Sequence, residues 1–519
     1  RYLSFDVILP RAVEVLGGYG ALVVTGIPLL LFIGAMGKSA QFPLYLWLPD
    51  AMAGPTPVSA LIHAATMVTA GVYLVTRCFV FFELSPGAMM FVAGTGAFTA
   101  IFAATIAFGQ TDIKKILAYS TVSQLGFMFL GCGVGAFYTG MFHVTTHAFF
   151  KALLFLGAGA VIVAMAHNQD IRNYGNLRKY LPITFFTMFI AWFAISGIIP
   201  FAGFFSKDDI LAKTFASGGY WSMDGGLDTR ILYAIALFTA LLTAAYMTRM
   251  FVLTFLSKEE RWRNIQQEEH HADAHSHVHS HGIHEHHEDP HGFYLSHEEQ
   301  TQTHDDEHEH HHQLTPDFTP KEVKPSMWIP LAVLAVLSLI GGAVLSGLYP
   351  IPELFGFHVP NFFKEWLYPS TSPSVLPTKE MFHVSHSVEI VLILASLSAA
   401  VIGIGVMLRK YGKGLPETEK EMRGWRYIAG QQWLYDSTMY RLFVHWGGRF
   451  ANGFYKWFDA GIIDGVFVNG TGWFVSTTGK ILRRMQSGFV RSYAMMMLVG
   501  TVILVAVIWY FIQKPQGTP

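Results

Sequence analysis

Long apolar runs alternate with short polar connections along this chain, and the pattern predicts membrane-spanning helices. The hydrocarbon core of a bilayer, about 30 Å thick, requires about 20 apolar residues in helical conformation. By that measure we expect an all-α polytopic membrane protein with about ten or eleven transmembrane helices. Ten are placed near residues 15–37, 57–82, 87–109, 116–135, 138–165, 182–204, 229–256, 327–348, 386–408 and 489–512.

Prolines interrupt the apolar pattern in two places. Pro43 and Pro49 lie in the first, and Pro200 lies in the second. Because proline lacks a backbone donor and clashes with the preceding turn, it breaks a helix and frees carbonyl groups. We therefore expect residues 38–50 and 205–217 to continue two broken helices. Discontinuous helices at corresponding places in two halves indicate a transport site, and two unrelated kinks are the alternative interpretation.

Composition supports the membrane assignment. The 519 residues are 52% hydrophobic and only 14% charged, whereas a soluble domain has about 25% charged residues. The 35 Lys and Arg nearly balance the 36 Asp and Glu. This balance gives no reason to expect a nucleic-acid partner, so the expected surroundings are the lipid bilayer and other proteins.

Two lysines lie at the edges of these apolar stretches. Lys38 follows the run that begins at Gly26, and Lys207 follows Pro200 and precedes Asp208. An ammonium group at the centre of a bilayer costs roughly 2.5–3.5 kcal/mol on insertion scales, so it requires a polar partner, water or a function. Two such lysines indicate an ion path.

Histidines share the apolar spans with these lysines. His143, His147 and Lys151 are spaced i, i+4 and i+8, so they form one stripe on a helix. Histidine titrates near neutral pH, and a stripe of this kind has the geometry of a proton relay. His63 stands alone on its span, and the alternative for it is an ordinary hydrogen-bonded core histidine.

Lys114 and Lys115 allow two interpretations. They are either interfacial cations at the start of a helix or the centre of the relay. The residues that follow, 118–126, are rich in hydroxyl and amide side chains. Such side chains suit a hydrated interior better than a lipid-facing surface, which favours the relay.

The segment from Glu268 to His312 has a different composition. It holds sixteen of the 24 histidines, mixed with Asp and Glu. It lacks the apolar residues needed for a core, so we expect a solvated loop. Imidazole and carboxylate groups bind Zn²⁺, Ni²⁺ or Cu²⁺, but the irregular spacing predicts no defined metal site. A metal sensor or storage protein that acts through this loop is nevertheless one functional hypothesis.

Five segments follow from these patterns. We expect a helical core over 1–257, the histidine-rich loop over 258–326, further transmembrane helices over 327–423, a lateral amphipathic helix over 424–487, and an anchoring span and tail over 488–519. The lateral helix is predicted from aromatic residues at three- and four-residue steps with interleaved basic residues. These aromatic residues are Trp433, Tyr440, Phe443, Trp446, Phe450, Phe454, Trp457 and Phe458.

Three motifs resemble the antiporter-like membrane subunits of respiratory complex I. They are the segments 42–74, 112–126 and 204–211. Mrp-type cation/proton antiporters and membrane-bound hydrogenases share these motifs. The C-terminal segments, around 433–436, 463–470 and 482–488, resemble the largest and most distal of the complex I antiporter-like subunits.

The resemblance implies roles for individual residues. Lys38 resembles the lysine of the first broken helix, with His63 behind it. The central connection is implied to comprise Lys114 or Lys115, His143, His147 and Lys151, and the exit site Lys207 with Asp208. The family pairs its first lysine with a glutamate on an earlier helix. No residue before Arg1 supplies it here, so we expect N-terminal spans to be missing from this sequence.

The resemblance implies a proton-translocating subunit of NADH:quinone oxidoreductase in a bacterial inner membrane. Its partners would be other membrane subunits of the complex, above all a neighbouring antiporter-like subunit. NADH, FMN, iron–sulfur clusters and quinone are implied in partner subunits. We expect no cofactor in this chain, which has neither a cysteine cluster nor a Gly-x-Gly-x-x-Gly motif after a strand. The alternatives are an Mrp-type Na⁺/H⁺ antiporter subunit and a membrane-bound hydrogenase subunit.

Overall fold

The computed structural model describes residues 5–223, 228–263, 318–348, 359–371, 381–417, 423–486 and 488–513. Contacts between residues divide the chain into two compact units, Arg1–Leu434 and Tyr435–Pro519. The histidine-rich tract from Glu268 to His312 lies outside the described residues, so its solvated character stays a prediction.

Helices account for the predicted spans. Eight helices in the described ranges are long and apolar enough to cross a membrane. They are α2 (Ala21–Lys38), α7 (Pro86–Gly109), α8 (Ile113–Gly133), α9 (Phe137–Ala164), α13 with its π-helical end η4 (Thr229–Leu256), α15 (Pro325–Ser346), α19 (His386–Tyr411) and α25 (Val490–Gln513). The all-α polytopic class is therefore confirmed. Eight of the ten predicted spans are long helices, and the other two are divided.

The predicted span 57–82 is one of these divided helices, although no proline lies within its break. It consists of α4 (Thr56–Ala64), α5 (Ala70–Arg77) and α6 (Phe79–Glu83). Threonine hydroxyls bond carbonyl groups around the break, as Thr66 donates to Leu61 and Thr69 donates to Ala65. Local hydroxyl groups thus satisfy backbone groups that a continuous helix would pair, which the apolar pattern did not reveal.

The break near Pro200 lies where the sequence predicts one. Helix α10 (Pro182–Ser196) ends at Gly197, whose φ of 78° suits a residue without a side chain. Helix α11 (Ala202–Ala216) follows and carries the predicted continuation. Gly203 allows α11 to approach α10, because a Cβ atom at this position would lie 1.9 Å from the carbonyl oxygen of Ala194.

The break after Lys38 differs from the expectation. Helix α2 ends at Lys38, and the helical pattern resumes only in the short α3 (Trp47–Asp50). Most of the expected continuation over 38–50 is therefore irregular backbone. The side chain of Gln41 donates to the carbonyl of Ser39, and the hydroxyl of Ser39 accepts from the backbone of Gly71 on α5. These bonds hold the irregular segment against its neighbour.

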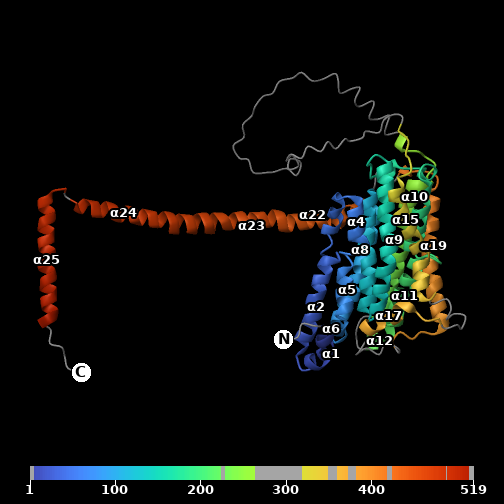
Figure 1. Ribbon diagram of the computed structural model, residues 1–519, viewed down its shortest axis with the longest axis horizontal. Coiled ribbons are helices and arrows are strands. Elements are labelled where there is room, and N and C mark those ends of the chain that lie inside the picture. The colour runs from blue at the N-terminus through green and yellow to red at the C-terminus, as the bar shows by residue number, and fades with distance from the viewer. Residues whose placement is uncertain are drawn as a thin grey trace, which may run out of the picture. The chain divides into compact units, whose positions relative to one another are not determined.

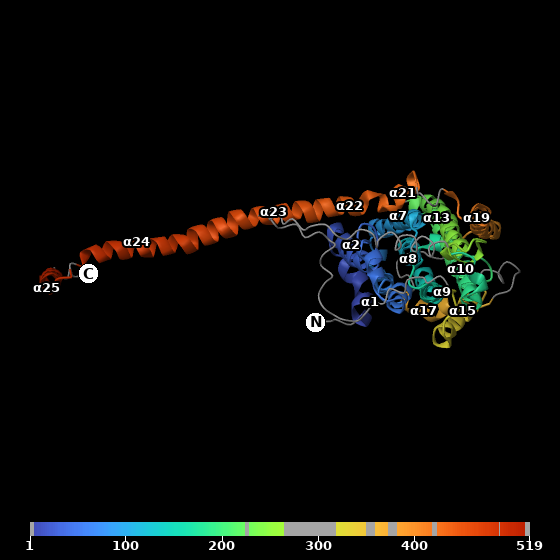
Figure 2. The same cartoon turned by 90° about the horizontal axis from the view of Figure 1, so that it is seen from above.

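Helix α8 lies at the centre of the first unit, with its membrane-length segment wholly enclosed. Figures 1 and 2 show it among α2, α7, α9 and α10 in a bundle of roughly parallel helices. Small residues allow close packing against α7, since a Cβ atom at Gly126 would lie 2.5 Å from the carbonyl oxygen of Gly96. Because this segment is enclosed, the polar side chains within it face other helices rather than lipid.

The end of the first unit is fixed to α7. The short helix α21 (Trp425–Gly430) packs against it, with Trp425 stacked on Phe108 at 5.7 Å between ring centroids. The side-chain amide of Gln110 donates to the carbonyl of Gly430 at 2.9 Å. The indole of Trp433 donates to the hydroxyl of Thr105, also at 2.9 Å.

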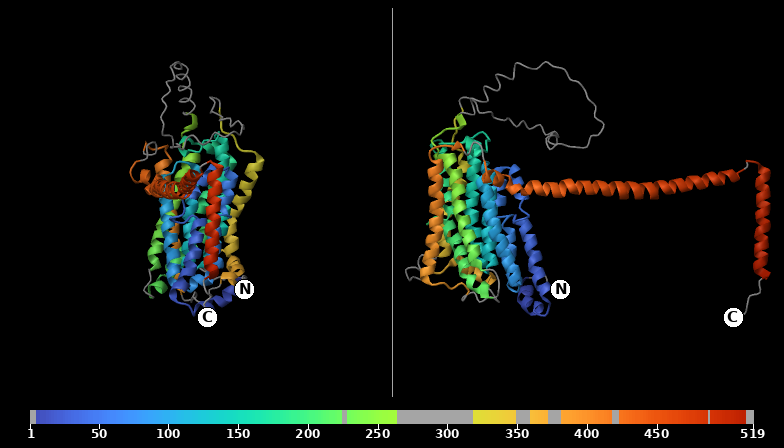
Figure 3. Two further views of the ribbon diagram at one scale, coloured as in Figure 1. Left: turned by 90° about the vertical axis from the view of Figure 1, so that its left-hand side faces the viewer. Right: turned by 180° about the vertical axis from the view of Figure 1, so that it is seen from behind.

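The second unit consists of one long helical run followed by a separate helix (Figure 3). The run comprises α22 (Tyr435–Met439), η6 (Tyr440–His445), α23 (Trp446–Phe454), η7 (Tyr455–Asn469) and α24 (Gly470–Met485), where η6 and η7 are π-helical. Its aromatic side chains are exposed, and so is the whole apolar surface of α25 (Val490–Gln513). Helices occupy residues 435–485 and the final span, whereas residues 425–434 of the segment predicted as one lateral helix belong to the first unit. Their packing against neighbouring subunits stays a prediction.

We predict that Gly203→Ala destabilises the bundle, because the added methyl group cannot fit against the carbonyl of Ala194. Overpacking of this kind costs about 1–3 kcal/mol. The thermal unfolding midpoint in detergent should fall accordingly. Gly94→Ala in α7 is the matched control, since nothing lies within 4 Å of a Cβ atom there. Equal midpoints for the two variants would contradict the close approach.

Candidate functional site

The buried side chain of His147 is hydrogen-bonded to the backbone at the break between α4 and α5. The carbonyl of Ala64, at the last residue of α4, accepts a hydrogen bond from Nδ1 of His147 at 3.0 Å. Because a carbonyl only accepts, Nδ1 of His147 carries the proton. In the neutral ring, Nε2 is then the atom that can accept a proton, and it is buried without a hydrogen-bond partner among the described residues.

His63 lies on α4, fully buried, with its ring centroid 4.7 Å from that of Phe155. Neither ring nitrogen of His63 has a hydrogen-bond partner in the described part of the chain. Phe155 also lies near Lys151, whose Nζ is 5.8 Å from the ring centroid. One aromatic ring on α9 is therefore shared by the lone histidine and the lysine of the stripe.

His143, one turn before His147, has partners on both ring nitrogens. Nε2 donates to the amide oxygen of Gln124 on α8 at 3.1 Å, and Nδ1 lies 2.9 Å from the hydroxyl of Ser206 on α11. Ser206 lies 2.6 Å from the hydroxyl of Thr146. A hydroxyl both donates and accepts, so this pair can serve either protonation state of the imidazole.

Lys151 completes the predicted stripe and is fully buried. Its Nζ donates to the carbonyl of Leu117 on α8 at 3.0 Å. The ring centroids of His143 and His147 are 6.1 Å apart. The three side chains therefore follow one another along α9 as their spacing predicts.

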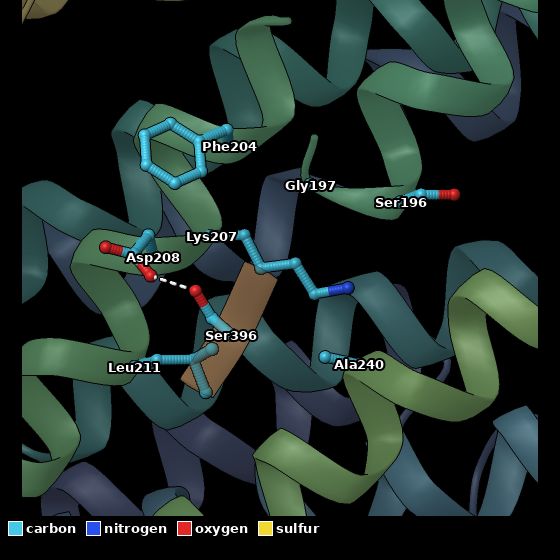
Figure 4. Close-up of a pocket in the computed structure, with 8 residues that line it drawn as sticks. All are labelled: Ser196, Gly197, Phe204, Lys207, Asp208, Leu211, Ala240 and Ser396. Atoms are coloured by element: carbon cyan, nitrogen blue, oxygen red, sulfur yellow. Dashed lines mark hydrogen bonds between the residues drawn. The ribbon is translucent and has the colours of Figure 1, made fainter. Parts of the chain in front are cut away.

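Lys207 and Asp208 line a small cavity between α10, α11, α13 and α19, together with Ser196, Gly197, Phe204, Leu211, Ala240 and Ser396 (Figure 4). The cavity has room for about one water molecule. Lys207 is 3% exposed, and its Nζ lies 4.8 Å from the ring centroid of Phe127. It has no hydrogen-bond partner among the described residues. Asp208 instead accepts a hydrogen bond from Ser396.

The structure distinguishes the two adjacent lysines at the start of α8. Nζ of Lys114 donates to the carbonyls of Met52 and Gly54, at 2.8 and 3.1 Å, and the side chain is buried. Lys115 is exposed. The carboxylate of Asp112 caps the helix by accepting from both backbone amides. Lys114 is therefore the one of the two that belongs to the interior.

Lys38 lies apart from these buried side chains. It is the last residue of α2 and is exposed. In the described ranges, no hydrogen bond joins its side chain to the histidines or to the other lysines. The structure thus brings His63, His143, His147, Lys151, Lys207 and Asp208 into the interior of one bundle, but it does not bring Lys38 with them.

Polar residues that the sequence reasoning did not select complete the site. Gln124 lies within the motif 112–126 and Ser206 within the motif 204–211. Residue spacing alone does not predict that both are hydrogen-bonded to His143. Ser396 lies in the apolar run of α19 and carries no signal of its own. Asp209 accepts from the hydroxyl of Tyr138 at 3.3 Å.

These buried groups lack carboxylate partners. Ion pairs in the described ranges include those of Arg172 with Asp170, Arg230 with Asp228, Arg261 with Glu259 and Arg263 with Glu260, in segments that flank or connect the spans. The described residues contain no group of His, Cys, Asp and Glu side chains arranged to hold a metal ion. Basic groups without counter-ions in an apolar bundle are suited to accepting and releasing protons rather than to stabilising the fold.

Comparisons with known proteins agree with the fold and the motifs. Residues 4–231 match the family described as NADH:quinone oxidoreductase/Mrp antiporter, transmembrane. The chain is 35% identical to NADH-quinone oxidoreductase subunit L of Neisseria meningitidis, over 98% of this chain and 70% of that protein. It is 38% identical to subunit L of Mycobacterium tuberculosis, over 93% of this chain and 64% of that protein. The Mrp complex from Dietzia sp. DQ12-45-1b has a similar fold, with a TM-score of 0.53 and 21% identity over 96% of this chain and 43% of that one.

We predict different effects for the two lysines of α8. Lys114→Met leaves the carbonyls of Met52 and Gly54 without their donor, which costs about 1–3 kcal/mol. Lys115→Met removes only an exposed charge and should change the stability by less than about 0.5 kcal/mol. Thermal unfolding midpoints of the two variants in detergent test this difference. A larger loss in Lys115→Met than in Lys114→Met would contradict the assignment.

Proposed function

Because this chain belongs to the family of NADH-quinone oxidoreductase subunit L, we propose that it carries protons across the membrane through its buried lysines and histidines. The observation that supports the proposal most strongly is the set of protonatable side chains in the interior of the bundle. They extend from the broken helix α4 to the broken helix α11, and among the described residues Lys151 contacts a backbone carbonyl and Lys207 has no hydrogen-bond partner.

The proposed relay follows these side chains from α4 along α9 to α11. His63 and Lys151 meet at Phe155, and Lys151 follows His147 along α9. His147 accepts protons at Nε2, because its Nδ1 donates to the carbonyl of Ala64. His143 exchanges protons with the hydroxyl of Ser206, the residue before Lys207.

Water is needed where the protonatable atoms are too far apart for direct transfer. Proton transfer requires heavy atoms about 2.6–3.2 Å apart, or one water molecule between them. The ring centroids of His143 and His147 are 6.1 Å apart. The buried nitrogens without protein partners, on His63, His147 and Lys207, are the positions at which we expect water.

In this proposal the chain itself performs no redox chemistry. Electron transfer from NADH through FMN and iron–sulfur clusters to quinone would take place in partner subunits. The free energy that it releases would drive proton movement in this chain through contacts between the subunits. The partners would be other membrane subunits of complex I, including a neighbouring antiporter-like subunit, in a bacterial inner membrane. The exposed apolar surfaces of the second unit support such packing.

An Mrp-type Na⁺/H⁺ antiporter subunit is the second candidate, and a membrane-bound hydrogenase subunit is related to it. The likeness of the fold to the Mrp complex keeps this candidate open. The identity of 35–38% to complex I subunits over more than nine-tenths of the chain favours complex I. Mass spectrometry of the co-purified complex distinguishes the candidates, because only complex I partners include NADH-oxidising flavoprotein subunits.

We predict that Lys207→Ala lowers NADH-driven proton pumping at least about tenfold, as expected when a proton-transferring group is lost. The amount of assembled complex should not change. Fluorescence quenching of a pH-sensitive dye in membrane vesicles measures the pumping. Lys179→Ala is the matched control, because Lys179 is exposed in a connecting segment. Pumping at the parental rate in Lys207→Ala would exclude the exit role.

We further predict that Lys151→Met slows pumping more than His143→Ala or His147→Ala. A water molecule can replace an imidazole in a proton path, whereas it does not replace the positive charge of a lysine. The same vesicle assay, normalised to NADH oxidation, compares the three variants. If Lys151→Met pumps as well as the parent protein, the lysine is not an obligatory part of the path.

A further inference from the structure

Ser396 is a polar residue in the middle of the apolar helix α19 (His386–Tyr411). Its hydroxyl donates to the Oδ1 atom of Asp208 on α11 at 2.5 Å. The same hydroxyl lies 3.0 Å from the carbonyl oxygen of Ile393, one turn earlier on its own helix. Figure 4 shows the hydrogen bond between Ser396 and Asp208, two of the residues that line the cavity together with Lys207.

Asp208 requires a partner from another helix. It is 5% exposed, so water cannot freely solvate its carboxylate. Lys207 is adjacent in sequence, and adjacent residues of a helix do not face each other. Consistent with this, the ammonium group of Lys207 lies over the ring of Phe127. Ser396 supplies the hydrogen bond that neighbouring residues on α11 cannot.

The other ionisable groups near Asp208 do not replace this hydrogen bond. Asp209 on α11 has its own hydroxyl partner, Tyr138 on α9. Glu389 on α19 is a carboxylate like Asp208, so in its charged form it has no hydrogen to donate. Among the side chains of the described residues, Ser396 donates the hydrogen bond to Asp208.

The two acceptors around Ser396 suit both protonation states of Asp208. When the carboxylate is charged, the serine hydroxyl donates to it, because a bond to a charged acceptor is the stronger one. When the carboxyl group is protonated, it can donate to the serine oxygen, and the serine hydroxyl turns to the carbonyl of Ile393. The side chain of Asp208 can therefore stay in place while its proton comes and goes.

We propose that Ser396 is a positioning residue for proton transfer, holding Asp208 at the cavity beside Lys207 in both of its protonation states. This inference rests on the proposed function of the chain as a proton carrier. It adds a residue of α19 to a site that the sequence motif confines to α11. Ser396 itself neither gains nor loses a proton, because its hydroxyl hydrogen stays on the serine in both states and only the acceptor of that hydrogen changes.

The test compares Ser396→Ala with Ser396→Thr in the assembled complex, in membrane vesicles that oxidise NADH. Ser396→Ala should lower pumping per NADH oxidised by about tenfold, the factor expected for one hydrogen bond to a charged group. Ser396→Thr should restore pumping, because a helical threonine hydroxyl can reach the same carbonyl acceptor. Ser398→Ala is the matched control, since Ser398 lies on the same helix and is exposed.

A double-mutant cycle shows whether Ser396 acts through Asp208. In an Asp208→Leu background, which removes the acceptor but keeps the branched shape, Ser396→Ala should change pumping less than about twofold. If the effects of Ser396→Ala and Asp208→Leu on pumping were fully additive, or if Ser396→Thr lost as much pumping as Ser396→Ala, the serine would act through packing and the inference would be overturned.

Pumping by these variants distinguishes the role of Ser396 from that of the exit site formed by Lys207 and Asp208. Parental pumping in Ser396→Ala, together with impaired pumping in Lys207→Ala, overturns the role of Ser396 alone. Parental pumping in both Lys207→Ala and Asp208→Leu overturns the exit site, and the inference about Ser396 with it.

Discussion

The constraint on which this structure depends is the cost of a basic group inside an apolar helix bundle. A lysine ammonium in a bilayer interior costs roughly 2.5–3.5 kcal/mol on insertion scales. Lys151 and Lys207 are nevertheless almost fully buried, and their contacts are a backbone carbonyl and aromatic rings rather than carboxylates. A permanent ion pair would hold the proton on the lysine. A backbone carbonyl and an aromatic ring bind the ammonium group more weakly, so the lysine can release its proton.

Helix breaks make such contacts possible. In an unbroken helix each carbonyl is occupied by the amide four residues on. The end of α4 frees the carbonyl of Ala64, which then fixes the tautomer of His147. The short 3₁₀ helix η1 (Ala51–Ala53) after α3 and the residue that follows it similarly offer two carbonyls to Lys114. Interrupted helices are tolerated inside a membrane only where other groups satisfy the backbone. In this bundle the polar side chains of the site provide part of that satisfaction.

The sequence predicted the helical class, most span positions and the stripe on α9, because these depend on residue spacing within one helix. It did not predict the break after Ala64, where no proline marks the position. It also could not separate the buried Lys114 from the exposed Lys115. Contacts between distant helices, such as that of Ser396 with Asp208 across 188 positions, depend on packing that no local pattern encodes.

The central claim is that water connects the buried protonatable groups. A cryo-electron microscopy map of the assembled complex, at a resolution that shows ordered water, tests it most directly. We predict water within hydrogen-bonding distance of Nε2 of His147 and of Nζ of Lys207, two of the buried nitrogens for which the described residues supply no hydrogen-bond partner. A map in which both nitrogens contact only carbon atoms, with no water between His143 and Lys207, would contradict proton transfer along this path.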